Sequence, residues 1–103
     1  MKNTINIKAR KVTSFEKISG LVGKNNPEPI FFYTSFGIHT FGLKFPIDVV
    51  ILNKRGKIAS IYQGVKPNRI MFWNPRHNIV LELPQGFVKK KSLNLGTQVN
   101  LLQ

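Results

Sequence analysis

The apolar run at residues 47–52, Ile-Asp-Val-Val-Ile-Leu, constrains the fold of this chain more than any other feature. Successive side chains of a strand point to opposite faces of a sheet, so a run that is apolar on both faces needs cover on each side. The next four residues, Asn-Lys-Arg-Gly, are typical of a hairpin loop in which Gly56 has positive φ. The sequence therefore predicts a covered strand that turns into a partner strand at residues 57–63.

Other short apolar or alternating segments, bounded by Gly, Pro and Asn, continue this pattern along the chain. The further strands that we expect cover residues 4–10, 30–34, 37–45, 78–83 and 97–102. The stretch at residues 64–77 mixes aromatic, basic and loop residues, which favours an irregular connection that includes one edge strand.

Two segments predict short helices. Residues 13–16, Thr-Ser-Phe-Glu, match a capping box and open a helix that ends near Gly23. Residues 87–95 predict a helical turn that ends at Gly96. The fold expected from these elements is mainly β, a small sandwich or a partly open, jelly-roll-like barrel with one or two short helices.

Length and composition restrict the class of protein. The 103 residues leave room for one domain, which we place at residues 1–103. We find no apolar stretch of the roughly 20 residues that cross a membrane, and no apolar run after the basic start that would indicate a secretory signal. The cytoplasm is the default location, with export or envelope association left open. The chain has no Cys, which rules out disulfides, thiol catalysis and Cys-based zinc sites.

The charge is unusual, because sixteen Lys and Arg residues stand against four acidic residues and give a formal net charge of +12. Self-repulsion of this size costs stability, and it favours an anionic partner such as nucleic acid, an acidic lipid surface or an acidic protein. A solvated basic surface without such a partner is the alternative.

Asp48 is the only aspartate and has apolar neighbours. A carboxylate in such a place must find partners or have its pKa raised by desolvation. It is either a catalytic or ligand-binding acid, or a structural carboxylate bonded to backbone N–H groups or to a basic residue.

His39 and Glu82 are the other polar side chains set among expected strands. In a regular strand His39 would share its face with apolar residues, which favours a core histidine; near Asp48 it could instead form an acid–base pair. Glu82 lies on the opposite parity to Leu81 and Leu83. We take His39, Asp48 and Glu82 as a candidate pocket.

The segment at residues 64–77 is the best candidate for nucleic-acid binding. Its aromatic and basic side chains could stack bases and neutralise phosphates; alternatively, Phe72 and Trp73 fill the core while the cations face water. The candidate anion-binding residues are Arg69, Trp73, Arg76, Lys89, Lys90 and Lys91. The two histidines, His39 and His77, lack metal-ligand spacing, and no phosphate-binding glycine loop is present, so we expect no metal and no cofactor.

Residues 38–50, Ile-His-Thr-Phe-Gly-Leu-Lys-Phe-Pro-Ile-Asp-Val-Val, followed by the Gly-containing turn, resemble the signature of domain-of-unknown-function family 192. Residues 80–86, Val-Leu-Glu-Leu-Pro-Gln-Gly, and residues 95–96, Leu-Gly, fall where that family has similar elements. Residues 19–23, Ser-Gly-Leu-Val-Gly, are similar to its Arg-Gly-Leu-Leu-Gly. The resemblance spans nearly the whole chain and implies a mainly β sandwich or jelly-roll fold with no established activity. Some members resemble exported or envelope-associated proteins.

The chain departs from the family pattern at a few places. The family more often has Met at Leu43, an acidic residue at Asn53, and a smaller residue in the Arg-His-Asn stretch at residues 76–78. These changes remove acids and add bases, which suggests that the positive charge is peculiar to this member.

Three functional hypotheses follow. The first is a non-catalytic binding or accessory domain with a pocket near His39, Asp48 and Glu82. The second is binding of nucleic acid or another polyanion through the basic surface. The third is a hydrolase that uses His39 and Asp48, which requires a concave pocket with both side chains exposed.

Overall fold

A five-stranded sheet lies at the centre of the molecule, with its strands in the order β2-β3-β8-β5-β6. The structure is a computed structural model that describes residues 4–12, 28–35, 37–41 and 43–103. The strands of this sheet are β2 (Arg10–Lys11), β3 (Ile30–Tyr33), β8 (Ile79–Pro84), β5 (Ile47–Leu52) and β6 (Ile58–Val65). β2 and β3 are parallel, and the other neighbours in the sheet are antiparallel.

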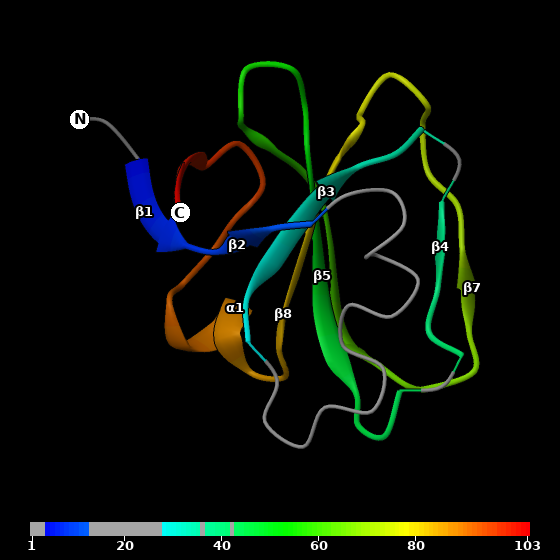
Figure 1. The fold of residues 1–103 in the computed structure, drawn as a ribbon. Helices are drawn as coiled ribbons and strands as arrows, with labels where there is room; N and C mark the ends of the chain where they lie inside the picture. The colour runs from blue at the N-terminus through cyan, green and yellow to red at the C-terminus, as the bar shows by residue number, and fades with distance from the viewer. Residues whose placement is uncertain (1–3, 13–27, 36, 42) are drawn as a thin grey trace.

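Two smaller sheets and a short helix flank the central sheet (Figure 1). β1 (Thr4–Lys8) pairs in parallel with β9 (Gln98–Leu102), and the helix α1 (Phe87–Lys90) precedes β9 in the chain. β4 (Ile38–His39) pairs antiparallel with β7 (Ile70–Met71) and forms a two-stranded ribbon. Figure 1 shows β1 and α1 on one side of the central strands and the β4–β7 ribbon on the other. This mainly β architecture with a short helix confirms the predicted fold class.

β5 is the best-covered strand, and all six of its residues are buried. Val50 and Leu52 face one apolar cluster, which includes residues of β1, β9 and α1. Val49 and Ile51 face a second cluster, against which the inner side chains of the β4–β7 ribbon pack. A strand between two cores is what the apolar run predicts, and this prediction is confirmed.

The hairpin between β5 and β6 also agrees with the prediction. Gly56 has φ of 79°. The Oδ1 atom of Asn53 accepts hydrogen bonds from the backbone N–H groups of Arg55 and Lys57, at 2.9 and 3.0 Å. The turn is therefore stabilised by its own first residue, a common role of Asn in turns.

The strand expected at residues 4–10 is divided into β1 and β2, which belong to different sheets, and two other expected elements are much shorter in the structure. The strand expected at residues 37–45 is limited to Ile38–His39, because Thr40 bonds to the loop before β7 and Phe41 turns out into solvent. The helical turn expected at residues 87–95 ends at Lys90, since Ser92 has φ of 52°. The helix expected at residues 13–23 lies outside the described residues. None of the helices in the described part of the chain has the length and apolar character needed to cross a membrane.

Candidate nucleic-acid interface

Asp48 lies in β5 and is completely buried. Its Oδ1 atom accepts a hydrogen bond of 2.9 Å from the N–H of Gly64. Its Oδ2 atom accepts two more, from the N–H groups of Gly86 at 3.1 Å and Val88 at 3.0 Å. Three donors satisfy the buried carboxylate and tie β5 to β6 and to the start of α1. In this arrangement Asp48 holds segments together and has no surface that a ligand can touch.

Glu82 lies in β8, opposite Ile30 of β3 and Val49 of β5. Its side chain is 6% exposed, and burial raises the pKa of its carboxyl group to about 7. Asp48 pairs with Leu83, the next residue of β8. Because side chains alternate along a strand, the carboxyl groups of Asp48 and Glu82 point to opposite faces of the central sheet.

His39 is solvent-exposed in β4 and is not the core histidine that strand parity suggested. Its Nδ1 atom accepts a hydrogen bond of 3.2 Å from the N–H of Phe41, and the two rings stack with their centroids 4.9 Å apart and their planes 25° from parallel. Asp48 and Glu82 lie within the two cores, whereas His39 lies on the outside of the ribbon. The structure therefore does not bring these three candidate residues together.

The segment at residues 64–77 divides its aromatic residues between core and solvent. Met71 and Trp73 pack against the core, and the Trp73 Nε1–H donates a hydrogen bond of 2.7 Å to the carbonyl oxygen of His77. Ile70 and Phe72 point the other way and are 59% and 75% exposed. Of the two alternatives for this segment, Trp73 follows the core one, while Phe72 remains available to a partner.

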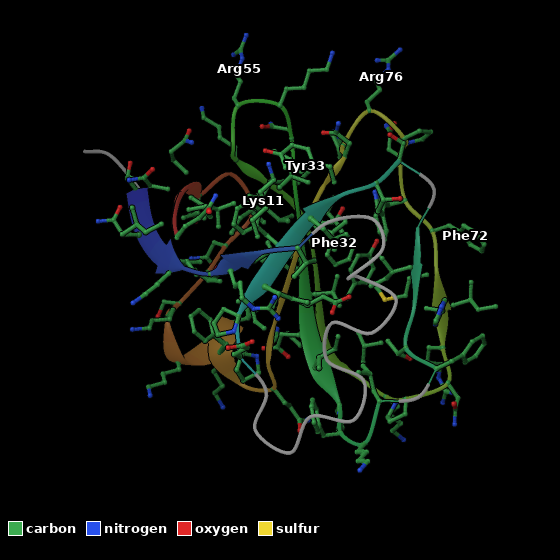
Figure 2. The ribbon with its side chains drawn as sticks, viewed as in Figure 1. Lys11, Phe32, Tyr33, Arg55, Phe72 and Arg76 are labelled. Atoms are coloured by element: carbon green, nitrogen blue, oxygen red, sulfur yellow. The ribbon has the colours of Figure 1, made fainter. Side chains whose placement is uncertain are left out.

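Four side chains form one outward surface on the β4–β7 ribbon: His39, Phe41, Ile70 and Phe72. His39 pairs with Ile70 across the ribbon, Phe41 is 46% exposed, and Phe72 lies against Gly37. We call this surface the aromatic ribbon face. Figure 2 shows Phe72 on the side of the ribbon away from β5. Phe41 and Ile70 are not singled out by the sequence. Residues 70–73 are apolar in both alternating sets and do not reveal which side faces out, and Phe41 lies in a segment expected to be a longer strand.

Thr40 holds one end of the ribbon together. Its hydroxyl group donates to the carbonyl oxygen of Lys66 at 2.8 Å and accepts from the N–H of Arg69 at 2.8 Å. The backbone N–H of Thr40 donates to the carbonyl oxygen of Arg69 at 2.9 Å. The side chain is buried, so this residue, which the sequence did not single out, is a positioning residue for the ribbon. The one signal for it in the sequence is a polar residue inside the family signature at residues 38–50.

The charged side chains are distributed very unevenly between core and surface. Every Lys and Arg in the described residues is solvent-exposed. Of the described acids, Asp48 and Glu82 are buried, which leaves Glu28 as the exposed one, and its Oε1 atom lies 3.1 Å from Nε of Arg10. The described surface therefore carries many cations and almost no compensating carboxylates.

Lys54, Arg55 and Arg76 meet at one end of the molecule, where the β5–β6 hairpin and the loop before β8 line a shallow hollow of about 420 Å³ with Asn53 and His77. Arg55 and Arg76 project from this end in Figure 2. Among the residues that the structure describes, no acidic side chain lines the hollow. Such a group of cations can neutralise closely spaced phosphates, and each Arg can bind one with two parallel hydrogen bonds.

The remaining candidate anion-binding residues lie elsewhere. Arg69 is exposed at the Thr40 end of the ribbon. Lys89 and Lys90 are exposed in the last turn of α1, and Lys91 follows them with its Nζ atom 6.0 Å from the ring centroid of Phe87. Within the described residues no group of three or more His, Cys, Asp or Glu side chains could hold a metal ion.

Comparison with known proteins identifies a family without an assigned activity. Residues 5–101 match DUF192, described as Uncharacterized ACR. No curated protein sequence matches.

Two solved structures share the fold. One is a protein of unknown function from Novosphingobium aromaticivorans, with a TM-score of 0.71 and 14% identity over 92% of this chain and 71% of that chain. The other, from Sinorhizobium meliloti, is described as a candidate transcription regulator, with a TM-score of 0.67 and 18% identity over 90% of this chain and 76% of that chain. At these identities the likeness establishes the fold alone.

Proposed function

Since this chain belongs to the DUF192 family, whose description assigns no activity, its function has to be inferred from its own surface, and we propose that it is a non-catalytic module that binds nucleic acid. The observation that carries this proposal is the charge of the surface. All described Lys and Arg side chains are exposed, whereas the described carboxyl groups other than that of Glu28 are buried. A surface of one sign attracts a polyanion and releases its condensed counterions on binding.

The hollow lined by Lys54, Arg55 and Arg76 supports nucleic acid as the polyanion. Guanidinium groups bind phosphate oxygens in a planar, two-bonded geometry that suits a sugar–phosphate backbone. The Sinorhizobium meliloti protein that shares the fold is described as a candidate transcription regulator, and this description is consistent with nucleic-acid binding by that protein.

A hydrolase that uses His39 and Asp48 has no support in the geometry. That hypothesis requires both side chains in one accessible pocket. Asp48 has no exposed surface, and its two carboxylate oxygen atoms accept hydrogen bonds from three backbone N–H groups. His39 lies in a different sheet. Binding without catalysis is therefore the simpler account of this site.

An electrophoretic mobility shift at two salt concentrations tests the proposal. We expect single-stranded and duplex DNA and RNA to be shifted at about 50 mM salt and much less at about 200 mM, because counterion release makes phosphate contacts salt-sensitive. Absence of any shift at the lower salt concentration would overturn the proposal.

Two matched triple variants locate the contact. One replaces Lys54, Arg55 and Arg76 with Gln, and the other replaces Lys89, Lys90 and Lys91 with Gln, so that each removes three positive charges. If the hollow contacts phosphates directly, the first variant loses clearly more affinity than the second. Equal losses would indicate that only the overall charge matters.

A further inference from the structure

The aromatic ribbon face exposes more apolar surface than the fold requires. Phe72 is 75% exposed, Ile70 59% and Phe41 46%, and His39 is also exposed and stacks on Phe41. The inner side chains of the same two strands already pack on the core. Large apolar side chains that gather on one outer surface are a mark of an interaction site rather than of folding.

The four side chains form a row along the ribbon. Ile38 pairs with Met71 and His39 with Ile70, so Phe72 comes first along the ribbon, the Ile70–His39 pair lies side by side in the middle, and Phe41 comes last. Outward positions two residues apart on a regular strand are roughly 6.5 Å apart, whereas the rings of His39 and Phe41 stack more closely, with their centroids 4.9 Å apart. An extended single strand can place one base on the ring of Phe72 and another on the outer face of the His39–Phe41 stack.

Both ends of the ribbon are held by the structure. At one end Gly37 has φ of 113° and lies so close to the carbonyl oxygen of Met71 that a Cβ atom there would collide with it. At the other end Thr40 bonds to Lys66 and Arg69. The backbone that carries the row is therefore held in place before a partner arrives, which lowers the entropy cost of binding.

Cations stand at both ends of this row. Arg69 and Lys66 are exposed beside the Thr40 end. Beyond the Phe72 end the chain enters the loop before β8, from which Arg76 projects into solvent beside the hollow described above (Figure 2). Aromatic rings between cations are what single-stranded nucleic acid needs, since bases stack on the rings and phosphates meet the charges. We infer that the aromatic ribbon face is a base-stacking surface for single-stranded nucleic acid, an inference that rests on the proposed function.

Two other occupants fit the same face less well. A second copy of the chain would bring two surfaces of a protein with a net charge of +12 together, and this repulsion acts within the Debye length of about 8–10 Å. An anionic membrane would attract the cations, but insertion into a membrane does not require aromatic rings, because any apolar side chain can insert. His39, Phe41 and Phe72 are rings, and two of them already stack on each other.

The test measures the fluorescence anisotropy of a labelled oligodeoxythymidine of about 12 nucleotides, a length within the usual site sizes of single-strand binders. We expect Phe72→Leu, which keeps an apolar side chain but loses the ring, to weaken binding about fivefold or more, at the lower end of what one base–aromatic stack provides. Phe72→Tyr keeps the ring and should bind within about twofold of the wild type. The slope of affinity against salt should stay unchanged in both, because no phosphate contact is lost.

Tyr33→Leu is the matched control. Tyr33 is 51% exposed and lies in β3 beside Lys11, whose Nζ atom is 5.3 Å from its ring centroid. The Tyr33→Leu substitution removes an exposed ring from another surface and should leave oligonucleotide binding unchanged. An unlabelled duplex of the same length should compete less well than the unlabelled single strand, because its bases are already stacked within the helix and only its phosphates can be bound.

The outcomes separate this inference from the proposed function. If Phe72→Leu binds the oligonucleotide as tightly as the wild type, with the same salt dependence, the aromatic ribbon face does not stack bases. The proposal that the protein binds a polyanion is then unaffected. The inference is also overturned if Phe72→Leu instead abolishes binding to phosphatidylglycerol vesicles alone, or dissociates a dimer seen by sedimentation. If neither single-stranded nor duplex nucleic acid binds at low salt, the proposed function itself fails.

Discussion

The Oδ2 atom of Asp48 accepts a 3.0 Å hydrogen bond from the backbone N–H of Val88, and so joins the central strand β5 to the start of α1. The same carboxylate also binds the N–H groups of Gly64 and Gly86. The aspartate near the end of the family signature at residues 38–50 thus has a structural role. It keeps the β6 strand and the turn before α1 in register with β5.

Asp48→Asn should destabilise the protein by about 2–4 kcal/mol, because the amide has one acceptor atom where the carboxylate offers two, and its NH2 group faces a backbone donor. Chemical denaturation measures the change, and Glu28→Gln, at an exposed carboxylate, is the control with little expected effect. At temperatures where the variant is folded, its affinity for nucleic acid should match that of the wild type. A stable Asp48→Asn protein would contradict the structural role.

Thr40→Val should cost about 1–3 kcal/mol, because Val has the shape of Thr but leaves the Arg69 N–H and the Lys66 carbonyl without the hydroxyl group that they bond. Hydrogen exchange should become faster at the Arg69 amide first, since the loss is local. Thr40→Ser keeps the hydroxyl group and should retain most of the protection. Unchanged exchange at Arg69 in Thr40→Val would show that the hydroxyl group does not hold the ribbon.

Gly37→Ala should be markedly more destabilising than Gly96→Ala. Both positions have positive φ, 113° and 86°, so each substitution strains the backbone. A Cβ atom at Gly37 would also collide with the carbonyl oxygen of Met71, whereas nothing lies within 4 Å of one at Gly96. We expect about 1–2 kcal/mol for Gly96→Ala and clearly more for Gly37→Ala. Equal midpoints of thermal unfolding would rule out the close approach at Gly37.

Glu82 predicts a pH dependence of stability. Burial raises the pKa of its carboxyl group from 4.5 to about 7 in the folded chain. Between these values the folded state keeps a proton that the unfolded state has lost, so Glu82 lowers the free energy of unfolding as the pH rises through this window. Below about pH 4.5 the free energy of unfolding keeps the full contribution of protonated Glu82. Above about pH 7 this contribution is lost, and the loss is on the order of 3 kcal/mol.

Glu82→Gln removes this titration, because the amide is neutral in both states. The free energy of unfolding of the variant, relative to that of the wild type, should therefore increase from about pH 4.5 to about pH 7 and then level off. Denaturant titrations across this range measure the difference, and all ionisable groups other than Glu82 are common to both proteins. A difference that does not change with pH would contradict the raised pKa.

Sequence patterns predicted the parts of the fold that depend on local chemistry. The run at residues 47–52 shows a buried strand because it is apolar on both faces, and the hairpin after it follows from Asn53 and Gly56. The strand expected at residues 37–45 failed because Thr40 bonds to a loop far along the chain. No local pattern contains that partner.

The candidate site was harder to predict than the fold. The polar residues His39, Asp48 and Glu82 attracted attention because they stand among apolar neighbours, but strand pairing puts the two carboxyl groups on opposite faces of the sheet. The side chains now proposed to contact a partner are ordinary Phe, Ile and cationic residues. Whether such residues face the core or solvent depends on which side of the ribbon packs inward, and this is decided by tertiary contacts.

The dependence of affinity on salt for a single-stranded oligonucleotide tests the central claim most directly. If phosphates contact the basic surface, a plot of log Kobs against log salt concentration is linear and falls with a slope of about −0.7 for each phosphate neutralised. The variant that replaces Lys54, Arg55 and Arg76 with Gln should have a shallower slope than the wild type. Binding that does not change with salt, or no binding at about 50 mM salt, would contradict the account.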